Sequence, residues 1–178
     1  MEKGKIQLLR GDITTLQVDA IVNAANTSLL GGGGVDGAIH RAAGPQLLAE
    51  CRTLGGCPTG EARLTKGYNL PARFVIHTVG PVWHGGHRQE AALLKSAYLS
   101  SLKLAEKQAL KSLAFPNIST GVYGFPKDKA ARIALTTVKQ FLSQHPRPET
   151  VIFCCFDEEN YQIYEKLLSQ NSLSEQGD

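Results

Sequence analysis

The sequence lacks a strong excess of charge of either sign. Its 178 residues carry 19 Lys and Arg against 16 Asp and Glu, which gives a net charge of +3 at pH 7 with neutral histidines. Nucleic-acid-binding domains normally show clustered basic residues and a pI above about 9, whereas the pI here is about 8.7. The charge balance therefore gives little support to nucleic acid as a partner.

Long apolar runs and paired cysteine motifs are also missing. No window approaches the roughly 18 apolar residues that cross a bilayer, and residues 1–5 hold no apolar stretch suited to a signal peptide. Cys51, Cys57, Cys154 and Cys155 form no CxxC pair and no spacing typical of zinc. We therefore expect a cytoplasmic protein with buried free thiols, no bound metal and no membrane contact. Adjacent Cys154 and Cys155 should point to opposite faces of a strand.

The remaining composition is that of an ordinary globular domain. Hydrophobic residues make up 42% and charged residues 20% of the chain, which suffices to bury a core. No repeat, linker or low-complexity block divides the sequence. We expect one domain over residues 1–170 and a flexible polar tail over residues 171–178.

Short runs of β composition alternate with stretches of helical period. The predicted strands are Ile6–Arg10, Asp19–Ala25, Glu61–Lys66, Phe74–Val79, Ser112–Asn117 and Thr150–Phe156. The predicted helices are Val35–Ala43, Gln46–Leu54, Arg88–Gln108, Pro126–His145 and Glu158–Leu168. This alternation indicates an α/β fold with a mostly parallel sheet covered by helices on both faces. Ligands of such sheets bind beyond the carboxyl ends of the strands.

The first loop of this kind is NAANTSLLGGGGVDG at residues 23–37. Consecutive glycines permit unusual torsions and close approach of the backbone to a ligand, and the start of the following helix attracts anions. Gly32, Gly34 and Gly37 match GxGxxG literally, but several residues separate them from the strand, so the Rossmann interpretation is weak. A glycine turn without a ligand is the alternative.

The second loop is STGVYGF at residues 119–125. Its backbone amides suit an anion nest, and an ordinary strand-to-helix connection is the alternative. The loop has no Lys of a Walker A motif, and Ser119 is not in GxSxG because residue 117 is Asn. Two anion-suited loops in one small domain, with asparagines nearby for hydroxyl groups, favour a nucleoside diphosphate sugar as ligand.

Two further residues suit the base of such a ligand. Asp12 can accept a hydrogen bond from an amino group of the base, or cap a helical turn over Ile13–Leu16. Phe156 can stack on the base, or belong to the core.

Four motifs in order resemble the macrodomain family: DAIVNAAN at 19–26, GGGGVDGAIHRAAG at 31–44, HTVGP at 77–81 and STGVYGFP at 119–126. The likeness extends from about Ile6 to Leu168. Within this family, the sequence resembles the MacroD-type branch, which includes bacterial O-acetyl-ADP-ribose deacetylases. The resemblance implies a three-layer α/β/α domain with a mixed, mostly parallel six-stranded sheet that binds ADP-ribose in a cleft at its crest. The segment between Cys51 and Thr59 is shorter than in many relatives, which affects only the local helix and loop expected there.

The resemblance also implies roles for individual residues. Asp12 and Ile13 would contact the adenine, Phe156 the adenosine, and Asn23 and Asn26 the distal ribose. The first ligand loop would be Gly33, Gly34, Val35 and Asp36, and the diphosphate loop Ser119, Thr120, Gly121, Val122 and Tyr123. Asp36 and Asn26 match the catalytic residues. The family implies no cofactor.

Hydrolysis of an ester on the distal ribose needs a positioned water and stabilisation of the developing negative charge. Asp36 is the obvious base, but a carboxylate at a helix N-terminus is favoured in its charged form and is therefore a weak proton acceptor. We expect Asp36 to orient the water and the ribose while a ligand phosphate oxygen shares the proton. Asn26 would align the distal ribose, Tyr123 would close over the ligand, and amides around Gly121 would neutralise charge.

The histidines are given secondary roles. His40 lies one helical turn after Asp36 and could tune it, although we favour a surface or structural histidine. His77 is expected to be a satisfied core histidine. His84 and His87 form HxxH without an evident carboxylate or cysteine partner, which disfavours a metal site.

Three classes of function follow. The leading prediction is an enzyme that removes the acetyl group from O-acetyl-ADP-ribose and also cleaves ADP-ribosyl esters on Asp and Glu of proteins. A module that binds ADP-ribose without turnover is the second, and the presence of Asn26 and Asp36 favours the enzyme over it. An RNA-binding or regulatory protein is the third and has the least support.

Overall fold

The computed structural model describes residues 4–176, with side chains described to residue 170. The strands are Lys5–Arg10 (β1), Ala20–Ala24 (β2), Ala62–Lys66 (β3), Phe74–Thr78 (β4), Ser112–Phe115 (β5) and Thr150–Cys155 (β6). The helices are Gly34–Ala43 (α1), Pro45–Arg52 (α2), Glu90–Lys107 (α3), Lys127–Gln144 (α4) and Glu158–Gln176 (α5), with a 3-10 turn over Ile13–Thr15 (η1). Strands and helices alternate as the sequence predicts.

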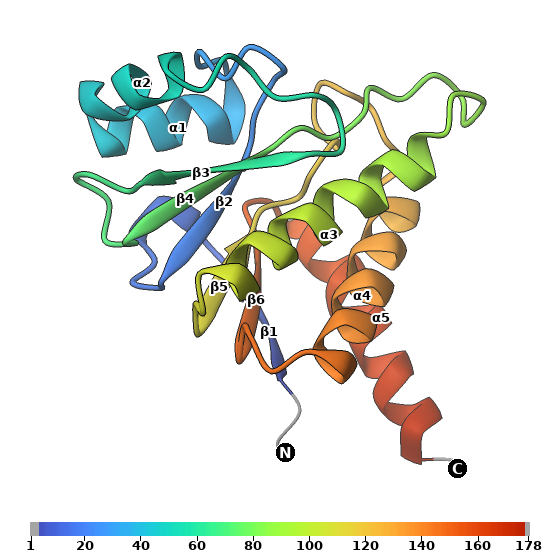
Figure 1. Cartoon of the computed structure of the whole chain (residues 1–178). Coiled ribbons are helices and arrows are strands. Elements are labelled where there is room, and N and C mark those ends of the chain that lie inside the picture. Colours follow the sequence, from blue (N-terminus) through green and yellow to red (C-terminus); the bar gives the residue numbers. More distant parts are fainter. Residues whose placement is uncertain (1–3, 177–178) are drawn as a thin grey trace.

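The six strands form one sheet in the order β1-β6-β5-β2-β4-β3. All neighbours are parallel except β3, which is antiparallel to β4. Helices α1 and α2 cover one face, and α3, α4 and α5 cover the other (Figure 1). The prediction of a three-layer α/β/α fold with a mixed, mostly parallel six-stranded sheet is confirmed.

Strands β2, β4, β5 and β6 supply both layers because successive side chains point to opposite faces. Cys154 packs in the cluster under α1 and α2, whereas Cys155 packs in the cluster under α3, α4 and α5. All four cysteines are free and buried, as predicted. Burial raises the pKa of Cys154 and of Cys155 to about 11, so both thiols stay protonated and behave as apolar core groups.

Several element boundaries differ from the prediction. Strand β5 ends at Phe115 rather than Asn117 because Pro116 has no N–H for the ladder. Pro126 is the N-cap of α4 with extended backbone and not part of its first turn. Helix α5 continues past Leu168 to Gln176. The flexibility expected of residues 171–178 stays a prediction, and residues 177–178 lie outside the described part of the chain.

Helix α3 begins at Glu90 rather than Arg88 because the Glu90 carboxylate binds the preceding loop. It accepts hydrogen bonds from the backbone N–H groups of His84 (2.8 Å), Gly86 (2.9 Å) and Arg88. These backbone amides belong to the loop and have no partner in a strand or helix, so the Glu90 carboxylate satisfies them. Within residues 4–176, no helix is long and apolar enough to span a membrane.

The Glu90 carboxylate should make the folded state sensitive to acid. Burial acts to raise its pKa, but the amide donors outweigh burial and lower the pKa from 4.5 to about 2. The stabilisation is therefore present above pH 4.5 and is lost as the pH falls towards 2. We expect Glu90→Gln to reduce the loss of unfolding free energy between pH 5 and pH 3, measured by urea denaturation. Glu165→Gln, a change at an exposed carboxylate of α5, is the control; an equal effect of both variants would contradict the assignment.

Candidate functional site

Every predicted site residue lies at or beyond the carboxyl end of a parallel strand. Asp12 and Ile13 follow β1, Phe156 follows β6, residues 119–123 follow β5, and Asn23 to Asp36 run from the end of β2 into α1. The sheet order places these four strands side by side as β1, β6, β5 and β2. At the usual strand spacing the row is about 14 Å wide. The residues predicted from separate parts of the sequence therefore form one continuous edge.

Asp36 lies in the first turn of α1 and is buried, with 4% of its surface exposed. Its Oδ1 accepts a hydrogen bond from Asn23 Nδ2 at 2.8 Å. Its Oδ2 lies under the glycine loop, because a Cβ built on Gly32 would be 3.1 Å from this oxygen and 3.4 Å from Asn26 Nδ2. One carboxylate oxygen is thus held by Asn23, and the other lies close to Gly32, as does the Asn26 amide nitrogen.

Asn26 organises the loop that precedes the glycines. Its Oδ1 accepts hydrogen bonds from Ser28 N (3.1 Å), Ser28 Oγ (2.6 Å) and Leu29 N (3.2 Å). Its Nδ2 donates to Gly31 O at 3.0 Å. Such Asx-turn bonds fix a loop that has no ladder partners of its own. The side chain predicted to align a ribose therefore also sets the path of the first ligand loop.

The loop after β5 is a compact turn closed by its own backbone. Phe125 N donates to Ser119 O at 2.9 Å, and Gly124 N donates to Gly121 O at 3.0 Å. Ser119 has a φ of 67° and is buried, and its Oγ has no hydrogen-bond partner among the described residues. A buried hydroxyl without a partner costs free energy unless a ligand or water satisfies it.

Asp12 and Phe156, the residues predicted to lie near adenine and adenosine, follow the paired strands β1 and β6. Gly11 N donates to Cys155 O at 3.0 Å, which brings the residues that follow each strand together. Asp12 caps η1 by accepting from Thr14 N at 2.9 Å, so the capping role is confirmed. Phe156 is 80% exposed, and its assignment to the core is wrong because it lies past the end of β6.

Sequence reasoning placed two histidines too far from the site. The His40 side chain is only 14% exposed, and its Nε2 lies 3.4 Å from Asp36 Oδ1. Of the two favoured alternatives, surface or structural, the surface one is therefore wrong. His77 is a buried core histidine as predicted, but its Nδ1 also lies 3.1 Å from Asn23 Nδ2. Strand periodicity gave no signal for this contact, because the pairing of Asn23 with His77 depends on the register of β2 and β4 in the sheet.

Comparison with known proteins identifies the family of this chain. The family model "Macro domain" matches residues 22–134, more than half of the chain. The chain belongs to the macro domain family. An Escherichia coli protein named O-acetyl-ADP-ribose deacetylase is 57% identical over 172 residues, which cover 94% of this chain and 97% of the relative.

Solved macrodomains show the same architecture. The Oceanobacillus iheyensis macrodomain with ADP superposes with a TM-score of 0.92 at 45% identity, covering 97% of this chain and 94% of that one. The Trypanosoma brucei macrodomain in complex with ADP-ribose superposes with a TM-score of 0.87 at 55% identity, covering 92% and 68%. The ligand-binding and catalytic assignments of individual residues in this macrodomain stay predictions.

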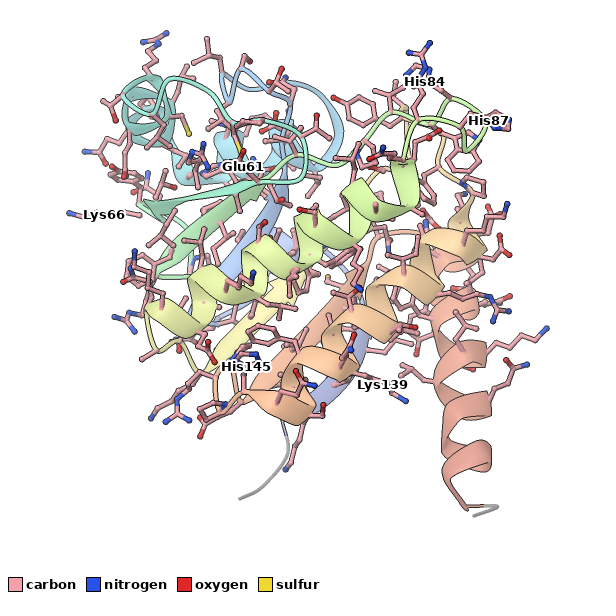
Figure 2. All side chains as sticks on the ribbon, turned by 45° about the vertical axis from the view of Figure 1, so that its right-hand side comes forward. Glu61, Lys66, His84, His87, Lys139 and His145 are labelled. Carbon is pink, nitrogen blue, oxygen red and sulfur yellow. The ribbon has the colours of Figure 1, made fainter. Side chains whose placement is uncertain are left out.

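The HxxH histidines lie in the loop between β4 and α3. His84 and His87 point outward from the loop before α3 (Figure 2), and both are exposed. Across the described residues, no group of three His, Cys, Asp or Glu side chains is placed to hold a metal ion.

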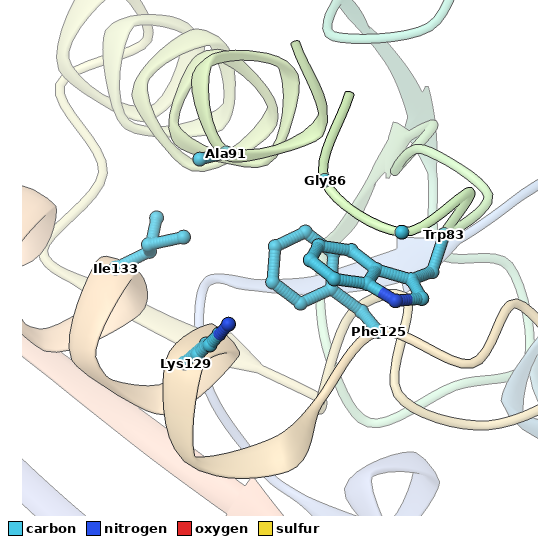
Figure 3. Close-up of a pocket in the computed structure, with 7 residues that line it drawn as sticks. Trp83, Gly86, Ala91, Phe125, Lys129 and Ile133 are labelled. Carbon is cyan, nitrogen blue, oxygen red and sulfur yellow. The ribbon is translucent and has the colours of Figure 1, made fainter. Parts of the chain in front are cut away.

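A cavity of about 300 Å³ lies behind the second loop of this macrodomain (Figure 3). Trp83 and Phe125 line it with ring centroids 4.7 Å apart, and Lys129 Nζ lies 5.6 Å from the Trp83 ring. Trp83 N also donates to Tyr123 O at 2.8 Å. The cavity contains none of the predicted site residues, so we assign this aromatic pair to support of the loop rather than to its chemistry.

Gly80 lets the strand ends approach the second loop closely. A Cβ at this position would lie 2.2 Å from Ser119 Oγ and 2.5 Å from Ile118 Cγ2. We expect Gly80→Ala to lower the free energy of unfolding by about 1 to 3 kcal/mol, as overpacking does, measured by urea denaturation. Gly11→Ala, where a Cβ meets nothing within 4 Å, should leave stability nearly unchanged; equal effects would show that the close approach is not what matters.

His77 should give stability a second pH dependence. Burial, and secondarily the nearby His40, lowers its pKa from 6.5 to about 3. Between these values the unfolded chain binds a proton that the folded chain does not. The free energy of unfolding therefore falls as the pH drops from 6.5 towards 3, by up to about 1.4 kcal/mol per pH unit. Urea denaturation between pH 7 and pH 5 should show a shallower slope for His77→Leu than for the wild type; identical slopes would refute this.

Proposed function

We propose that this macrodomain binds ADP-ribose along the carboxyl edge of its sheet and hydrolyses the acetyl ester of O-acetyl-ADP-ribose. One observation carries the proposal. The buried carboxylate of Asp36 and the amide of Asn26 both lie next to Gly32, in the same row of loops that holds the two anion-suited turns. The relative named O-acetyl-ADP-ribose deacetylase and the macrodomain solved with ADP-ribose support this assignment.

The order of the strands matches the order of groups along the ligand. Asp12 and Phe156, at the ends of β1 and β6, would contact the adenine. The loop after β5, residues 119–123, would bind the diphosphate through its backbone amides. The end of β2, with Asn23, Asn26 and Asp36, would then receive the distal ribose. A linear molecule laid across parallel strand ends meets these groups in this sequence.

The reaction adds water across the ester bond. The water oxygen bonds to the acetyl carbonyl carbon, the bond from that carbon to the ribose oxygen breaks, and a proton passes to the ribose oxygen. The products are acetate and ADP-ribose. Asp36 Oδ2 would accept a hydrogen bond from the attacking water, while Asn23 holds Oδ1. A ligand phosphate oxygen would share the proton that leaves the water before it reaches the ribose oxygen.

The same site would accept a related substrate. An ADP-ribosyl ester on Asp or Glu of a protein presents the same kind of carbonyl on the distal ribose, so the same water attack would release the protein. We therefore include ADP-ribosylated proteins as substrates of this proposal. Cytoplasmic localisation stays a prediction from the sequence.

Asp36→Asn tests the function directly. Removal of the carboxylate that orients the water should lower kcat for acetate release by about 100-fold or more, whereas calorimetry should still detect ADP-ribose binding. The matched control is Asp128→Asn, because Asp128 is also a carboxylate in the first turn of a helix, α4, but is exposed. Full turnover by Asp36→Asn would remove the proposed role of Asp36. Binding without any acetate release by the wild type would identify a non-catalytic ADP-ribose-binding module.

A further inference from the structure

Two buried polar side chains lie side by side behind the proposed catalytic residue. Asn23 of β2 and His77 of β4 are paired in parallel register, and each has none of its surface exposed. They face the layer of α1 and α2, where the neighbours on the same strands, Ile21 and Val75, are apolar. Polar groups in such a position are stable only if they are hydrogen-bonded.

The Asp36 carboxylate determines the orientation of the Asn23 amide. The amide nitrogen lies 2.8 Å from Asp36 Oδ1, and the reverse orientation would place two acceptor oxygens against each other. The same nitrogen lies 3.1 Å from His77 Nδ1. An amide nitrogen only donates, so each of its two hydrogens is used, one by Asp36 and one by His77.

The amide in turn determines the tautomer of His77. Because Nδ1 accepts a hydrogen bond, the ring is neutral and carries its hydrogen on Nε2. Nε2 lies 2.9 Å from Thr65 Oγ1 of β3, to which it donates, and 3.8 Å from Cys51 Sγ of α2. The chain of contacts therefore runs from Thr65 through His77 and Asn23 to Asp36, and spans three adjacent strands.

Each link removes one rotation from the next. The ring of His77 is held at both nitrogens, so it presents a fixed acceptor to Asn23. The amide of Asn23, held by that acceptor, presents a fixed donor to Asp36 Oδ1. With Oδ1 anchored, Oδ2 stays next to Gly32. Asn23 Oδ1 has no hydrogen-bond partner among residues 4–176, so the two donated bonds set the orientation of the amide.

We infer that His77 is a positioning residue that acts through Asn23 to hold the Asp36 carboxylate in the orientation needed for water attack. The expected effect on kcat rests on the proposed function. The fixed orientation of Asp36 rests on the hydrogen-bond chain alone. Second-layer groups of this kind matter because a misplacement of about 1 Å in a reacting group can cost about 100-fold in rate.

The kinetic test compares three changes at His77. His77→Leu removes the acceptor and should lower kcat about 10- to 100-fold while KM changes less than about threefold. His77→Asn returns an acceptor near the position of Nδ1 and should recover part of kcat. His77→Gln reaches towards Thr65 without that acceptor and should not. Unchanged kcat in His77→Leu, or equal rescue by Asn and Gln, would overturn the inference.

Thr78→Val is the matched control for a merely structural effect. Thr78 is the next residue of β4, is equally buried, and bonds Glu61 O and Ala97 O on the opposite face of the sheet. Its substitution should lower thermal stability without lowering kcat. A loss of kcat equal to that of His77→Leu would show that destabilisation of the strand, not positioning, explains the loss.

Nuclear magnetic resonance tests the chain independently of activity. In the wild type, the imidazole ¹⁵N signals of His77 should show a protonated Nε2 and an unprotonated Nδ1. The Asp36 ¹³Cγ signal should shift in His77→Leu and not in Thr78→Val. A protonated Nδ1 in the wild type, or an Asp36 signal indifferent to His77, would overturn the inference even if His77→Leu is too unstable to assay. Absence of acetate release by the wild type, with these signals as expected, would sink the proposed function alone.

Discussion

Parallel pairing of β1, β6, β5, β2 and β4 is the constraint on which the rest of the molecule depends. It forces five chain segments to end at one edge of the sheet and each to continue from there into a loop, four of them leading to a helix. Backbone N–H groups that no strand or helix uses gather at this edge, which makes it suited to an anionic ligand. Residues as distant in sequence as Asp12 and Phe156 become neighbours only because β1 and β6 share hydrogen bonds.

Close backbone approach is the second requirement of this edge. Gly37 has no room for a side chain because a Cβ would lie 2.6 Å from Gly32 O. Gly80 has none because Ser119 and Ile118 occupy the space. Apolar packing of two helical layers fixes the sheet beneath, so the loops are held by a rigid base. The buried hydrogen-bond chain from Thr65 to Asp36 costs little free energy of folding, because nearly all of its donors and acceptors are paired within the protein.

The fold was largely predictable from periodicity. The apolar run Phe74–Thr78 is a strand buried on both faces. The apolar stripe of Glu90–Lys107 identifies the helix face that meets the core. Boundaries were harder to predict because they depend on single contacts. The start of α3 at Glu90 is set by a carboxylate that binds three loop amides, and nothing in the local pattern announces that bond.

The sequence by itself determined the alternation of strands and helices and the positions of the two glycine-bearing loops. It also determined that Asp36 lies at the start of a helix. These features depend on local composition and spacing. Tertiary structure alone decided which polar groups touch. His40 faces Asp36 rather than solvent, and His77 reaches Asp36 through Asn23. Such contacts arise from strand order and register, which are set by the packing of the whole chain and not by any one segment of it.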